Sequence, residues 1–131
     1  MTLALKIACG LYAALVTMLG ARWWFAFEGI AEEWVVQPLG AIGVNNLLAD
    51  MGALFFGTAI MIGLGLRRGH STWLLAPALL MAIAALGRIL GYATGGFVPE
   101  TIVSFIFEIV SCALLVGTHL RMTKEAEESS I

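Results

Sequence analysis

Four long apolar stretches dominate the pattern of hydrophobic and polar positions along the chain. They cover residues 3–21, 43–66, 73–95 and 101–120. Each has about the 20 residues that a helix needs to cross the hydrocarbon core of a bilayer. We therefore predict an all-α fold, a polytopic membrane four-helix bundle that residues 1–131 form as a single membrane domain. The first stretch also fits a secretory signal peptide, but we expect it to be retained as a span.

An aromatic segment, residues 22–42, separates the first two spans. Its large apolar side chains recur at helical spacing, at Trp23, Phe27, Ile30 and Trp34. These four positions would share one face of a short helix. We interpret the segment as an interfacial helix with its aromatic side chains at headgroup depth. The alternative is an irregular connector that carries an aromatic belt.

Basic residues are distributed unequally between the two sides of the predicted spans. With four spans, the N-terminus, the 67–72 loop and the polar tail, 121–131, share one side. That side holds five basic residues against one on the other: Lys6, Arg67, Arg68, Arg121 and Lys124 against Arg22. The positive-inside rule then predicts a multi-pass protein of the bacterial inner membrane with both termini cytoplasmic. We expect the polar tail to be frayed.

The composition agrees with a membrane protein. Hydrophobic residues make up 60% of the chain and charged residues 12%, against about 45–50% and 25% in soluble domains. The net charge is −2, and no basic cluster suggests a nucleic-acid partner. The two cysteines, Cys9 and Cys112, lie in separate apolar runs without the spacing of a zinc site. We expect no metal and no cofactor, and the lipid bilayer is the partner that the composition implies.

Three of the spans each carry one isolated charge, at Asp50, Arg88 and Glu108. At about 1.5 Å of rise per residue, each charge lies about 10–12 Å inside the predicted outward end of its helix. A charge at the centre of a membrane helix costs about 2.5–3.5 kcal/mol on insertion scales. We therefore expect Arg88 to bind a carboxylate through two parallel N–H···O bonds. The remaining acid would bind a proton or a cation, or would be solvated in a pocket.

We predict that these charges line a polar pocket that opens outward beneath the aromatic segment. Its predicted ligand-binding residues are Arg88, Glu108, Asp50, Asn46, Asn45, Tyr92, Ser104, Trp23 and Trp34. Asn46 and Asp50 share a helix face that we do not expect to meet lipid. The ridge formed by Gly87, Gly91 and Gly95 should pack within the bundle. The alternative is a buried ion pair that only fixes which helices meet.

The chain resembles a bacterial family of small four-helix membrane proteins. That family is catalogued as a domain of unknown function and is loosely similar to DoxX-like proteins. The resemblance is strongest over residues 45–121 and is carried by Asn46, Asp50, Gly52, Gly57, Gly87-Arg88, Gly91, Gly95, Pro99 and Glu108. It implies a fold and a membrane location, and no established activity.

These observations favour a non-enzymatic inner-membrane protein, either an accessory protein or a ligand-binding protein with its site at Asp50, Arg88 and Glu108. Its partner would be another membrane protein or further copies of the chain, and its ligand a small apolar or amphipathic molecule. One alternative is an intramembrane enzyme acting on a lipid, sterol-like or quinone substrate, with Glu108 or Asp50 as general acid/base. Another is a proton-coupled transporter, which four helices would build only as an oligomer.

Overall fold

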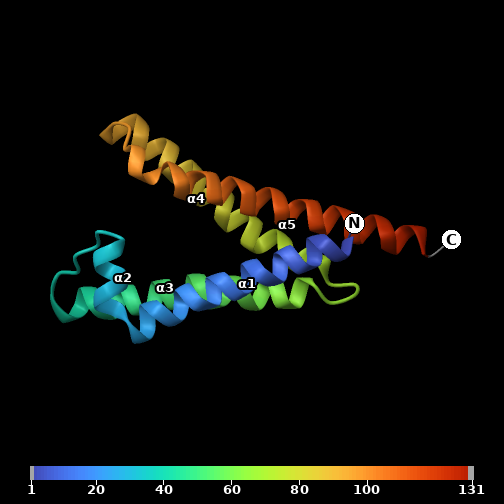
Figure 1. Ribbon diagram of the computed structural model, residues 1–131, viewed down its shortest axis with the longest axis horizontal. Coiled ribbons are helices and arrows are strands. Elements are labelled where there is room, and N and C mark those ends of the chain that lie inside the picture. Colours follow the sequence, from blue (N-terminus) through green and yellow to red (C-terminus); the bar gives the residue numbers. More distant parts are fainter. Residues whose placement is uncertain (1, 130–131) are drawn as a thin grey trace.

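The computed structural model describes residues 2–129, and all the regular structure in this part of the chain is helical (Figure 1). In chain order the elements are α1 (Thr2–Phe25), α2 (Phe27–Glu33), α3 (Gly40–Gly65), the 3-10 helix η1 (Ser71–Leu74), α4 (Leu75–Gly95), the 3-10 helix η2 (Pro99–Thr101) and α5 (Ile102–Glu128). Four helical runs are long and apolar enough to cross a membrane: Leu3–Phe25, Gly40–Gly65, Ser71–Gly95 and Pro99–Glu128. The predicted all-α fold with four spans is confirmed. By helix length and hydropathy, this is a multi-pass membrane protein.

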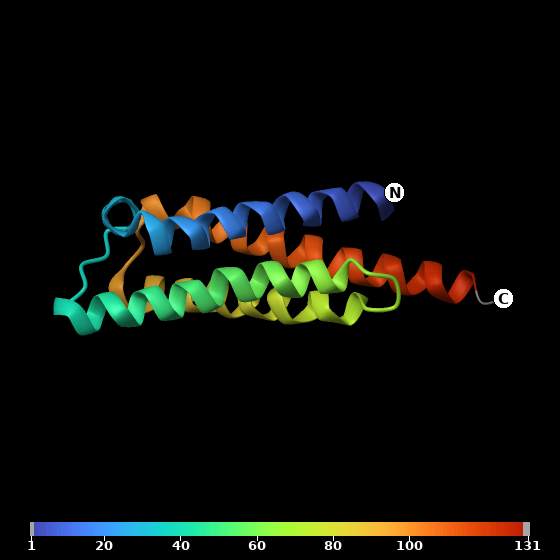
Figure 2. The ribbon, with the colours of Figure 1, turned by 90° about the horizontal axis from the view of Figure 1, so that it is seen from below.

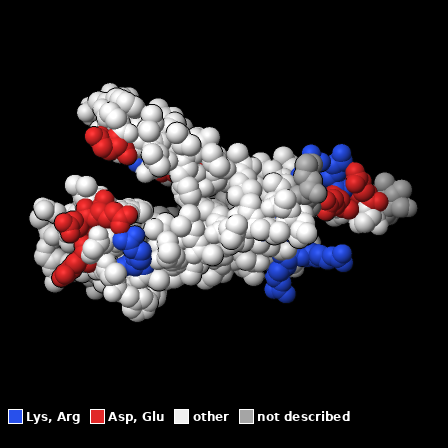
Figure 3. Space-filling model, in the orientation of Figure 1, with Lys and Arg blue, Asp and Glu red and all other residues white. Residues whose placement is uncertain are grey.

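The helices form two pairs that converge at one end of the molecule and separate at the other (Figure 1). α1 packs on α3 and α4 packs on α5, while α1 also contacts α5, and η1 lies against α3 and α5. The start of α1 and the end of α5 lie on the side where the pairs converge, as Figure 2 also shows. We name this the terminal end, and the opposite end, which holds α2 and the turn between α4 and α5, the α2 end. A recess between the pairs is visible there in Figure 3.

The buried core is small, as expected when lipid covers most of each helix. In the most apolar window of each span, 22% of the residues are buried inside the protein. The fully buried side chains include Trp23, Ile62, Leu74 and Leu115, which come from α1, α3, η1 and α5. The remaining apolar faces are therefore available to the bilayer.

Close helix packing occurs at glycines other than those of the predicted ridge. A Cβ atom at Gly65 would lie 2.6 Å from the Leu74 side chain and 3.0 Å from its backbone nitrogen, so α3 approaches η1 only because this residue is glycine. At Gly87, Gly91 and Gly95, a Cβ atom would meet nothing within 4 Å, and all three residues are exposed. The prediction that this ridge packs within the bundle is wrong.

The first and last helices, α1 and α5, extend beyond the predicted spans. α1 continues to Phe25. Near its end, Nη2 of Arg22 lies 2.5 Å from Oε2 of Glu33 in α2, and this ion pair neutralises the Arg22 charge. α5 continues through the tail as far as Glu128, because the tail residues favour helix and Lys124 lies 3.8 Å from Glu128 one turn on. The expectation of a frayed tail is wrong for the described residues, which end at Ser129.

The short helix α2 ends in a Schellman motif with an unusual residue. The Val36 N–H donates to the Ala31 carbonyl at 2.8 Å, and the Val35 N–H donates to the Glu32 carbonyl at 3.0 Å. This motif places Val35 at φ +54°. That region normally holds glycine, because a β-branched side chain is strained there.

Candidate functional site

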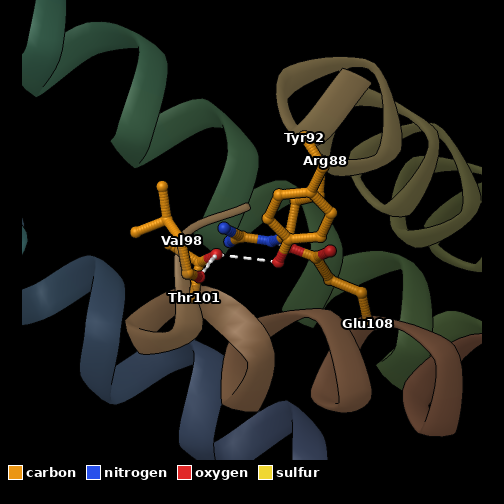
Figure 4. Close-up of polar contacts among 5 residues, drawn as sticks. All are labelled: Arg88, Tyr92, Val98, Thr101 and Glu108. Carbon is orange, nitrogen blue, oxygen red and sulfur yellow. Dashed lines mark hydrogen bonds and ion pairs between the residues drawn. The ribbon is translucent and has the colours of Figure 1, made fainter. Parts of the chain in front are cut away.

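Arg88 and Glu108 form an ion pair across the α4–α5 hairpin (Figure 4). Arg88 lies about two turns before the end of α4 and Glu108 about two turns after the start of α5, so the hairpin brings them level. The Nε of Arg88 donates to Oε1 of Glu108 at 2.7 Å. The Glu108 side chain is 10% exposed and that of Arg88 is 31% exposed. The predicted pairing of Arg88 with a carboxylate is confirmed.

This contact consists of one hydrogen bond. The predicted pair of parallel bonds is not formed, because the Nη groups of Arg88 make no hydrogen bond to any residue between 2 and 129. Within the same range, Oε2 of Glu108 is buried and has no hydrogen-bond partner. The pair therefore has unused capacity on both sides, a buried acceptor and a partly exposed group of donors.

A buried tyrosine from α1 lies next to this pair. The Tyr12 ring packs edge-to-face on Phe107, with ring centroids 5.6 Å apart. Its hydroxyl is buried and makes no hydrogen bond to a described residue. Tyr12 is not among the predicted site residues. The available signal was its spacing of three from Cys9, which places both on one face of α1.

A groove of about 230 Å³ opens beside Arg88 at the α2 end of α4. It is lined by Arg88, Gly91, Tyr92, Gly95, Gly96, Val98 and Thr101. The Thr101 hydroxyl donates to the Val98 carbonyl at 2.8 Å, and its oxygen lies 2.7 Å from the Tyr92 hydroxyl, which is therefore the donor in that second bond (Figure 4). These bonds hold the turn against α4. Two predicted residues, Arg88 and Tyr92, thus share one groove.

Four other predicted residues do not join this arrangement. Asp50, Asn45 and Asn46 of α3 and Ser104 of α5 are all exposed. In the described part of the chain, the Asp50 side chain has no hydrogen bond and no ion pair. The α1–α3 pair separates from the α4–α5 pair towards the α2 end (Figure 1), so the equal depth predicted for the three charges does not bring them together. The face that holds Asn46 and Asp50 is not covered by protein.

The two predicted tryptophans belong to an aromatic cluster at the α2 end of α1 and α3. Trp23 is fully buried, and its ring lies edge-on to Phe27 and Trp34 at centroid distances of 5.8 and 5.7 Å. Trp34 also contacts Phe55 of α3 at 5.8 Å. The cluster joins α1, α2 and α3. Trp23 and the fully buried Ile30 of α2 therefore face protein, and neither lies in the Arg88 groove.

Trp24 makes a further contact between α1 and α3. Its Nε1 donates to the Leu48 carbonyl at 2.9 Å, and its ring lies 4.6 Å from Phe56, centroid to centroid. A Cβ atom at Gly52 would overlap the Trp24 indole. Gly52 therefore gives Trp24 access to the backbone of α3.

Other polar groups in residues 2–129 give weaker indications of a site. No group of three or more His, Cys, Asp or Glu residues that could hold a metal ion occurs in this range. The Cys9 thiol lies 3.3 Å from the Thr118 hydroxyl, and His119 lies 3.1 Å from Ser71, both near the terminal end. A hollow of about 460 Å³ beside the end of α2 is lined by Ala31, Glu32, Val35, Val36 and Gln37, without a buried charge. The Arg88 groove is smaller but contains the ion pair's free donors.

Comparison of the chain with known protein families, with characterised proteins and with solved structures finds no match. The resemblance to an uncharacterised bacterial family therefore stays a prediction. What the structure itself supports is a small four-span membrane protein with a buried Arg88–Glu108 ion pair.

Proposed function

We propose that this protein is a ligand-binding membrane protein whose site is the groove beside the Arg88–Glu108 pair. The observation that carries the proposal is the orientation of Arg88, which uses Nε for Glu108 and has its Nη donors free next to a groove. By the positive-inside rule, the α2 end faces outward, so the groove would be entered from the outer half of the membrane.

An ion pair that served only to hold α4 against α5 would be expected to enclose both partners and to use the guanidinium fork fully. Here the Arg88 side chain is 31% exposed and contributes one bond. Intramembrane ionisable groups that face a cavity commonly mark binding sites or pathways. This geometry favours a binding role over a purely architectural one.

The acid–base enzyme alternative receives less support from the geometry. A general acid or base must lie within hydrogen-bond reach of the group it protonates or deprotonates. The free oxygen of Glu108 is buried, and Glu108 does not line the groove. Asp50 is exposed on the other helix pair.

Native mass spectrometry of the gently extracted full-length protein tests the proposal. The native protein should retain a small molecule, and Arg68→Met, in the exposed loop after α3, should retain it equally. The double variant Arg88→Met/Glu108→Leu removes both charges without leaving one unpaired, and it should release the molecule while staying folded. If no adduct is present, or if the double variant retains it as well as the native protein does, the binding site is not at this pair.

A further inference from the structure

The one charged residue that lines the groove, Arg88, is neutralised by its ion-pair partner. The Arg88 guanidinium is always charged, and the Glu108 carboxylate lies 2.7 Å from it. Every other residue that lines the groove has a neutral side chain or none: Gly91, Tyr92, Gly95, Gly96, Val98 and Thr101. Among the residues that line the groove, a ligand therefore meets no uncompensated charge.

The groove contains hydrogen-bond donors that have no acceptor in the described chain. A guanidinium has five N–H donors and no acceptor, and only Nε of Arg88 is used within the described chain. The Thr101 hydroxyl hydrogen is taken by the Val98 carbonyl, and the Tyr92 hydroxyl hydrogen by Thr101. The Nη groups are therefore a surplus of donors in a region of low dielectric, where unpaired polar groups are costly.

From this combination we infer that the groove selects an uncharged apolar molecule that carries a hydrogen-bond-accepting carbonyl, such as a ketone, a quinone or an ester. The inference rests on the proposed binding function. A carbonyl oxygen accepts from the Arg88 Nη groups and adds no charge. An anionic group would also accept from them, but it would leave a net negative charge beside Glu108 where solvent screening is weak.

The shape of the groove fits the apolar part of such a molecule. Gly91 and Gly95 line it without side chains, and a Cβ atom at either position would meet nothing within 4 Å. The face is therefore flat and open. A volume of about 230 Å³ is below the ~300–1,000 Å³ of a pocket that encloses a drug-sized ligand. The groove would thus hold the carbonyl-bearing end, and the rest of the molecule would extend into lipid.

Glu108 becomes the residue that determines specificity in this arrangement, although it does not line the groove. Glu108→Gln keeps an oxygen that can accept from Arg88 Nε and preserves the size of the side chain. It removes the neutralising charge, so the groove becomes cationic. Glu108→Gln should therefore change the preference of the site from a neutral acceptor to an anion, while the contacts between the ligand tail and the glycine face stay the same.

Binding of four probes to the full-length protein in nanodiscs tests this inference. Methyl palmitate carries an ester, decylbenzoquinone a quinone, hexadecanesulfonate a permanent anion, and hexadecane no polar group. We expect one or both carbonyl probes to bind the native protein at least about tenfold more tightly than the sulfonate and the alkane. Which carbonyl binds better distinguishes an ester from a quinone ligand. In Glu108→Gln the sulfonate should gain at least about tenfold relative to both carbonyl probes, and Arg68→Met should match the native protein.

The outcomes separate this inference from the function on which it rests. If the native protein binds the sulfonate as tightly as the carbonyl probes, or if Glu108→Gln does not change the order, the inferred ligand class is wrong while a binding site remains. If no probe binds the native protein better than hexadecane, the binding function itself fails at this groove. Arg88→Met/Glu108→Leu is the control that lacks the ion pair. It should bind all four probes alike, and a persistent carbonyl preference there would overturn the role of Arg88.

Discussion

Removing Arg88 should destabilise the protein more than removing Glu108, although the two residues form one ion pair. Arg88→Met strands a carboxylate whose side chain is 10% exposed, whereas Glu108→Leu strands a guanidinium that is 31% exposed and opens on a groove. Stranding one partner of a fully buried pair costs about 3–5 kcal/mol. Solvent screening lowers the cost for a partly exposed charge. We expect a loss of ~3 kcal/mol for Arg88→Met and of ~1–2 kcal/mol for Glu108→Leu.

The double variant Arg88→Met/Glu108→Leu completes the cycle. It strands neither charge, so its stability should return to within ~1 kcal/mol of the native protein. Free energies of unfolding come from denaturant titration in mixed micelles, followed by the helical circular dichroism signal, with Arg68→Met as the control for loss of a surface charge. The reasoning is refuted if Glu108→Leu costs more than Arg88→Met, or if the double variant is the least stable of the three.

Three further substitutions test other parts of the fold by the same titration or by thermal melting. Val35→Gly should stabilise the protein by ~1 kcal/mol, because it relieves the left-handed backbone at the end of α2; an unchanged melting temperature would show that the strain is absent. Gly65→Ala should cost ~1–3 kcal/mol because its Cβ would overlap Leu74, whereas Gly57→Ala, where a Cβ meets nothing, should gain up to ~1 kcal/mol in helix propensity. Equal effects would contradict the packing at η1. Asp50→Leu should not destabilise the protein, since Asp50 has no partner in the described chain; a loss above ~1 kcal/mol would reveal one.

The sequence was sufficient to predict the spans and a carboxylate partner for Arg88, for related physical reasons, but it left both Asp50 and Glu108 as candidates for that partner. An uncharged run of about 20 residues has few stable alternatives to a membrane helix. A single arginine within such a run needs a carboxylate. Arg88 and Glu108 lie on consecutive helices joined by a short turn, so equal distance from that turn brings them together. Connectivity therefore determined this contact.

The position of Asp50 relative to the ion pair could not be predicted in the same way. Counting residues from a helix end gives the depth of a side chain, but it gives neither its direction around the helix nor the separation of two helices. α3 and α4 diverge towards the α2 end, and Asp50 is exposed. The prediction that the glycine ridge packs within the bundle was wrong for a similar reason. Spacing predicts that Gly87, Gly91 and Gly95 share a face, and it does not identify what covers that face.

The unequal burial of Arg88 and Glu108 gives the two residues different positions relative to the groove. The residue that meets the groove is the arginine, whose charge does not titrate in proteins. The residue that neutralises it is enclosed between helices, where it does not line the groove. In the proposed site, Glu108 would set the net charge that a ligand experiences, and Arg88 would supply the donors that the ligand uses. With the positions exchanged, a carboxylate would face the groove, and its charge could change with pH or with a bound cation. The observed order instead keeps a fixed set of donors at the groove, with their charge compensated from the buried side.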